Sequence, residues 1–105
     1  MKIALKTNFN QLTEIIKILQ ENIVEATPET LAQKANKYLF ENIFKKLLKK
    51  QIDKHEARKE FKITMPYAEA FVLWQHLQTA TINDNYRKAV WFRVTGEIHQ
   101  KLQSS

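Results

Sequence analysis

Three histidines and one glutamate are the residues whose chemistry could serve catalysis or metal binding. The run HEARK, residues 55–59, begins like the zinc-protease motif H-E-x-x-H, but Lys59 stands where the second imidazole ligand is required. Glu69 and His76 are seven residues apart, near one face of a helix, and could form an acid–base pair. Two polar residues at the margin of a helix are the more common meaning of that spacing. No spacing supplies the three or four convergent ligands of a metal site.

Other catalytic signatures are missing from the sequence. The chain has no cysteine, its only serines are the last two residues, and its single glycine forms no phosphate-binding loop. The sequence therefore predicts a protein that is not an enzyme, with no catalytic residue, no metal and no cofactor. A small enzyme that uses Glu69 and His76 is the least favoured of three functional classes.

The strongest functional pattern is a repeat of cations. Lys46, Lys50, Lys54 and Arg58 recur at every fourth residue, which in a continuous helix places four cations in one column about 6 Å apart. Residues 45–62 contain eight basic and three acidic residues, a net charge of +5 out of the chain's +6 at pH 7. The positive charge is therefore concentrated in one segment. The predicted contact residues are Lys45, Lys46, Lys49, Lys50, Lys54, Arg58, Lys59 and Lys62.

This basic segment has several interpretations. The first is a grip on a polyanion, above all nucleic acid, with salt-dependent and sequence-independent binding, because no aromatic residues interleave for base stacking. The second is a self-associating structural or adaptor protein that meets an acidic protein surface. An acidic outer face of the first helix, with Glu14, Glu21 and Glu25, would allow a head-to-tail homo-oligomer. The third is a solvated face that only keeps the protein soluble. Contact with a membrane surface is disfavoured, because other helices can pack on the apolar side of this helix.

Length and composition predict one globular domain over residues 1–105. The chain is 44% hydrophobic and 27% charged, and it has no apolar run near the roughly 20 residues of a membrane-spanning helix. The apolar stretch at the N-terminus is too short and interrupted for a signal peptide. Since a chain without cysteine is compatible with a reducing compartment, we expect a cytoplasmic protein.

The predicted fold class is mainly α, a four-helix domain with a small two-stranded β-ribbon in the order β-α-α-β-α-α. One glycine and two prolines are too few for an all-β fold. Apolar residues alternate in residues 1–7 and 61–65, which predicts two strands that pair with each other. Helical periodicity predicts helices over residues 8–26, 28–58, 66–80 and 84–103.

Local signals fix several of these bounds. Asn8 and Gln11 have the spacing of a capping box, Thr27 before Pro28 opens the second helix, and Asn83 or Asp84 caps the last one.

The second and fourth helices carry two further expectations. A helix over residues 28–58 would be about 45 Å long, against a diameter of about 26 Å for a compact domain of this size. The helix must therefore break, near Asn36 or Gln51, or project its basic end from the body. Gly96 lies inside the fourth helix, where glycine is unfavourable, so a neighbouring backbone is expected to pass close to it.

Overall fold

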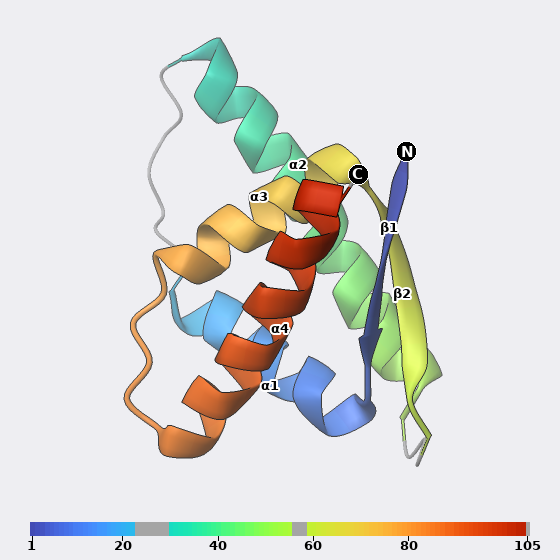
Figure 1. The fold of residues 1–105 in the computed structure, drawn as a ribbon. Helices are drawn as coiled ribbons and strands as arrows, with labels where there is room; N and C mark the ends of the chain where they lie inside the picture. The colour runs from blue at the N-terminus through green and yellow to red at the C-terminus, as the bar shows by residue number, and fades with distance from the viewer. Residues whose placement is uncertain (23–29, 56–58, 105) are drawn as a thin grey trace.

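A two-stranded antiparallel sheet and four helices make up the part of the chain that the computed structural model describes, residues 1–22, 30–55 and 59–104. The elements follow the predicted order β-α-α-β-α-α, which confirms the fold class (Figure 1). They are β1 (Lys2–Thr7), α1 (Phe9–Glu21), α2 (Leu31–Asp53), β2 (Phe61–Pro66), α3 (Tyr67–Gln78) and α4 (Asn85–Ser104).

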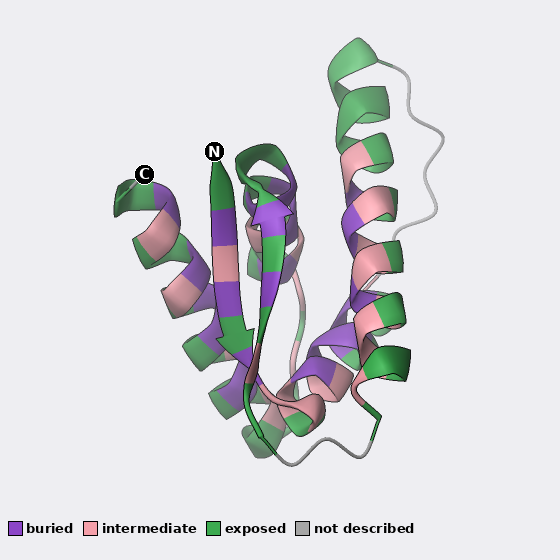
Figure 2. Cartoon of the chain, turned by 90° about the vertical axis from the view of Figure 1, so that its right-hand side faces the viewer, coloured by how far each residue is buried: buried purple, intermediate pink, exposed green. Residues whose placement is uncertain are grey.

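The sheet pairs the two strands that the alternation predicted. Ile3 lies opposite Met65 and Leu5 opposite Ile63, and all four side chains are buried. The other face of the ribbon carries exposed residues, among them Lys6 and its cross-strand partner Lys62. Two strands alone are marginally stable in water, so the helices must cover the apolar face. Figure 2 shows α3 behind the ribbon, α4 beside β1 and α2 beside β2.

Helix α1 begins where the sequence predicts. Asn8 is extended and accepts a hydrogen bond from the backbone N–H of Gln11 at 2.9 Å, which confirms the cap. The helix ends at Glu21, with Asn22 as C-cap, so it does not continue to Ala26 as predicted. The amide of Asn22 holds this end, because it donates to the Ile18 carbonyl at 2.8 Å and accepts from the Thr81 N–H at 2.9 Å.

Helix α2 is shorter than predicted at both ends and unbroken between them. Thr30 is extended and forms a capping box with Gln33, so the helix begins at Leu31 and not at Pro28. Thr27 and Pro28 themselves lie outside the described residues. The helix ends at Asp53, with Lys54 as C-cap, and not at Arg58. Its 23 residues span about 35 Å.

The end of α2 that projects from the body is the N-terminal one. Residues 31–38 are all exposed, and Figure 1 shows this end extending away from the other helices. The basic half packs instead, because Phe40, Ile43 and Leu47 are buried at helical spacing. The prediction of a projecting basic end was therefore wrong, since the apolar residues that reach the core begin only at Phe40.

Helices α3 and α4 complete the core. Helix α3 packs against every other described element and buries Ala70, Val72, Leu73 and Leu77, so it is the central helix. Helix α4 begins after Asp84, whose carboxylate accepts from the Arg87 N–H at 3.0 Å. Val90, Val94, Ile98 and Leu102 form its buried stripe at helical spacing.

The expectation for Gly96 was wrong. A Cβ atom at this exposed position would meet no heavy atom of another described element within 4 Å, so no neighbouring backbone of the described residues requires a glycine there.

No helix of the described residues is long and apolar enough to cross a lipid bilayer.

The packing of α2 leads to a test of stability with two residues of one helix. Leu47 is fully buried, whereas Ile52 is 76% exposed. We expect Leu47→Ala to lower the free energy of unfolding by about 2–5 kcal/mol through lost burial and a residual cavity. Ile52→Ala should change it by less than about 0.5 kcal/mol. Urea denaturation followed by circular dichroism measures both, and equal losses would contradict this account of how α2 packs.

Candidate functional site

The lysines of α2 lie on two different sides of the helix. Lys45 and Lys49 are exposed and point away from the core. Lys46 and Lys50 are half-buried, because they flank the stripe of Ile43 and Leu47 that enters the core. Residues four apart lie on nearly the same side of a helix, so Lys45 and Lys49 share one side. Lys46 and Lys50 share another side, and the two pairs therefore contact different surroundings.

Lys46 is neutralised by a carboxylate of its own fold. Its ammonium group lies 3.3 Å from Oε1 of Glu69, and the two side chains are 38% and 11% exposed. Glu69 stands in the first turn of α3, where the helix dipole also stabilises a negative charge. Lys46 therefore serves the contact between α2 and α3 and offers little charge to a ligand.

Lys54 is the C-cap of α2, and its ammonium group lies 5.8 Å from the ring centroid of Phe61, at the start of β2. This distance fits a cation–π contact. Because α2 ends at Asp53, the predicted column of four cations on one helix does not form. Arg58, its fourth member, lies outside the described residues.

The other three members of the predicted column, Lys46, Lys50 and Lys54, lie alongside β2. Lys54 is at the level of Phe61, where β2 begins, and Lys46 reaches Glu69, which follows the end of β2. Lys50 lies one helical turn from each of them, so it faces the same side. We call Lys46, Lys50 and Lys54 the lysine row.

The outer face of the ribbon adds positive charge. Lys62 is exposed and lies directly opposite Lys6, and like charges in this position repel each other. Lys59 is exposed as well. Lys6 is not among the contact residues predicted from the sequence, because its place depends on the register of the two strands. The alternation of apolar residues could have located Lys6. A register that places the buried residues of the two strands opposite each other also places Lys6 opposite Lys62.

Glu69 and His76, the candidate acid–base pair, do not come together. Glu69 contacts Lys46, whereas His76 stacks on Phe40 with 4.0 Å between ring centroids. The Nδ1 atom of His76 lies 3.0 Å from the Val72 carbonyl oxygen. Within the described residues, no three histidine, aspartate or glutamate side chains form a possible metal site.

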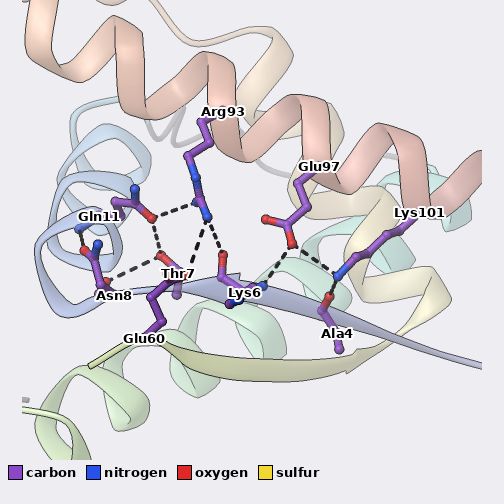
Figure 3. A network of polar contacts seen from close by, with 9 residues as sticks. All are labelled: Ala4, Lys6, Thr7, Asn8, Gln11, Glu60, Arg93, Glu97 and Lys101. Atoms are coloured by element: carbon purple, nitrogen blue, oxygen red, sulfur yellow. Dashed lines mark hydrogen bonds and ion pairs between the residues drawn. The ribbon is translucent and has the colours of Figure 1, made fainter. Parts of the chain in front are cut away.

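Two cations of α4, Arg93 and Lys101, are engaged with β1, as Figure 3 shows. Glu97 accepts a hydrogen bond from the backbone N–H of Lys6 at 3.1 Å, and Arg93 donates to the Lys6 carbonyl at 3.3 Å. Lys101 donates to the Ala4 carbonyl and pairs with Glu97 at 3.2 Å. These three side chains bind three main-chain groups on the edge of β1 that does not face β2.

The acidic face of α1 is neutralised too. Arg87 of α4 donates to Glu14 at 3.0 Å and to Glu21 at 2.6 Å. The hydrogen bond to Glu21 raises the pKa of Arg87, and Glu14 contributes further. Glu21 and Arg87 also border a small cavity of about 140 Å³. Glu14 and Glu21 therefore contribute little to the head-to-tail association that the sequence suggested, and Glu25 lies outside the described residues.

Comparisons of this chain with protein-family models, with curated proteins and with solved structures give no match.

The pair of Lys46 and Glu69 leads to a second test. Methionine at position 46 keeps the apolar stem of lysine but leaves the Glu69 carboxylate buried without its cation. We expect Lys46→Met to lower the free energy of unfolding by about 1–3 kcal/mol. Lys45→Met, on the exposed side of the same turn, should change it by less than about 0.5 kcal/mol. Urea denaturation at pH 7 distinguishes the two, and a silent Lys46→Met variant would mean that Glu69 does not depend on this lysine.

Proposed function

We propose that this protein is a non-enzymatic binding module that makes electrostatic contact with a polyanion, and that the polyanion is nucleic acid. The contact surface consists of the described cations of the basic segment that contact neither a carboxylate nor an aromatic ring. We call it the basic surface, and its members are Lys45, Lys49, Lys50, Lys59 and Lys62.

The observation that carries this proposal is the division of the cations into paired and unpaired ones. Both described arginines form ion pairs, Arg87 with Glu14 and Glu21 and Arg93 with Glu60. Lys101 pairs with Glu97 in the same way. Within the described part of the chain, no residue of the basic surface forms an ion pair. Lys2, Lys6, Lys34, Lys37 and Lys88 form no ion pair among the described residues either, so the basic segment is distinguished by how many unpaired lysines lie close together in its sequence.

The mode of contact follows from the chemistry of lysine. Each ammonium group acts as a point charge toward a phosphate and releases a condensed counterion, so the affinity must fall steeply with salt. A phosphate near the paired Lys6 and Lys62 would also relieve their mutual repulsion. Phe44 and Phe61 are partly buried against the core and provide no platform for base stacking. We therefore expect little preference for a base sequence.

The alternative of an acidic protein partner gains support from the main chain of β2, whose outer edge no other described strand covers. Self-association stays a prediction that sedimentation at several concentrations can test. A strict monomer at all concentrations would rule against it.

The basic surface predicts a salt dependence that mutation should change. In fluorescence anisotropy with 20-nucleotide DNA and RNA, the affinity should fall linearly on a double logarithmic scale between 50 and 200 mM salt. Lys45→Gln with Lys49→Gln should weaken binding and lower the slope by about 1–2. The control is Lys17→Gln with Lys88→Gln, which removes equal charge from α1 and α4 and should lower the slope less. Absence of binding at 50 mM salt would refute the proposal.

A further inference from the structure

The strand β2 has one edge that no other strand covers. In an antiparallel pair, successive residues point their main-chain N–H and C=O groups alternately toward the partner strand and away from it. The backbone N–H of Tyr67 donates to the Met1 carbonyl at 3.1 Å, and the N–H of Lys6 donates to Glu97 instead. Odd-numbered residues therefore bond across the ribbon, and even-numbered ones face outward. On β2, the outward groups belong to Lys62 and Thr64.

The described part of the fold supplies no partner for these outward groups. Among the described residues, no hydrogen bond reaches the main chain of Lys62 or Thr64 from outside the ribbon. Both residues are exposed. On β1, by contrast, Arg93, Glu97 and Lys101 of α4 bind the outward carbonyl groups of Ala4 and Lys6 and the outward N–H of Lys6, as Figure 3 shows. Side chains of α4 thus cover part of the edge of β1, whereas the edge of β2 is open among the described residues.

The open edge lies in positive surroundings. The lysine row of α2 runs along this side of β2, since Lys54 contacts Phe61 and Lys46 reaches Glu69. Figure 2 shows α2 on the β2 side of the ribbon and α4 on the other side. Lys62 adds its own charge to the edge, so an incoming strand with acidic side chains is complementary to it.

We propose that the open edge of β2 binds an extended acidic segment of another protein, which adds a third strand to the sheet. Main-chain hydrogen bonds to Lys62 and Thr64 give the affinity, and the surrounding lysines select acidic side chains. Lys50 and Lys62 offer this charge, because Lys46 is already paired. This site shares Lys50 and Lys62 with the basic surface but goes beyond the proposed nucleic-acid contact, since it uses the main chain of β2 and not Lys45 and Lys49 on the exposed side of α2.

Two other occupants fit the edge less well. If the edge of β2 paired with the same edge of a second copy, the Lys62 side chains and lysine rows of the two copies would lie close together. Such like charges disfavour pairing between edges. A nucleic-acid backbone presents phosphate oxygens, which accept hydrogen bonds but do not donate them. It therefore leaves the outward carbonyl groups of Lys62 and Thr64 unsatisfied, whereas a peptide main chain offers both donors and acceptors.

The test uses the whole chain and a synthetic peptide of eight residues in which glutamate and valine alternate. The matched peptide carries lysine in place of glutamate. We expect the acidic peptide to bind and to slow the hydrogen exchange of the Lys62 and Thr64 amides in NMR spectra. The Ile63 and Met65 amides, which face β1, should be protected with and without peptide. Stronger binding of the lysine peptide, or unchanged exchange at Lys62 and Thr64, would overturn the proposal.

Variants of β2 separate main-chain pairing from charge. Thr64→Pro removes one outward N–H without removing a bond to β1, and it should weaken peptide binding roughly five- to tenfold relative to Thr64→Val. Lys62→Glu keeps every N–H and reverses one charge, so it should also weaken binding. This second variant keeps the test open if Thr64→Pro disturbs the fold. Equal affinities of all three variants would overturn the proposal.

A further variant separates this site from the basic surface. Lys45→Gln with Lys49→Gln should weaken nucleic-acid binding and leave the peptide affinity within about twofold, because both lysines lie on the exposed side of α2. The proposal of a peptide site is independent of whether the protein binds nucleic acid. It is overturned if the peptide binds only by competing with nucleic acid for Lys45 and Lys49.

Discussion

The main-chain groups at the two edges of a two-stranded ribbon are the constraint on which this structure depends. Such a ribbon leaves half of its N–H and C=O groups without a partner strand. Helix α4 supplies side-chain partners to such groups of β1. The spacings match, because four residues of a helix advance about 6 Å and two residues of a strand advance about 6.6 Å. Arg93, Glu97 and Lys101 can thus contact Ala4 and Lys6 without bending either element (Figure 3). The arrangement fixes the position of α4 along β1.

The surface charge of the protein follows from this use of side chains. Arg93 and Lys101 are engaged at the edge of β1, and Arg87 is engaged with the carboxylates of α1. Only one cation of α2, Lys46, is neutralised by a described carboxylate. The described lysines of residues 45–62 other than Lys46 therefore have no described carboxylate partner, and Lys45, Lys49 and Lys62 are exposed on α2 and β2.

Those features that depend on neighbouring residues could be predicted from the sequence. The strands follow from alternation, the caps at Asn8 and Asp84 follow from short side chains before helices, and the stripe from Val90 to Leu102 follows from helical spacing. Contacts between distant residues were not accessible in this way. Lys46 and Glu69 are 23 residues apart in the sequence. Their contact removes one lysine of the repeat from the charge that is available to a ligand. The bounds of α2 were wrong because Thr30 caps the helix with Gln33 three residues later than Thr27 and Pro28 indicated.

The contrast between α4 and α2 explains why the edge of β2 stays open. Helix α4 presents both donors and an acceptor to β1, since Glu97 accepts while Arg93 and Lys101 donate. Two lysines of α2 make the described side-chain contacts on this side, Lys54 with Phe61 and Lys46 with Glu69, and an ammonium group donates but cannot accept. The lysine row therefore cannot accept a hydrogen bond from the outward N–H groups of Lys62 and Thr64. No other group of the described residues accepts from them, so an acceptor from outside the described fold, or water, is needed to complete them. An acidic strand brings that acceptor together with the negative charge that the lysines attract.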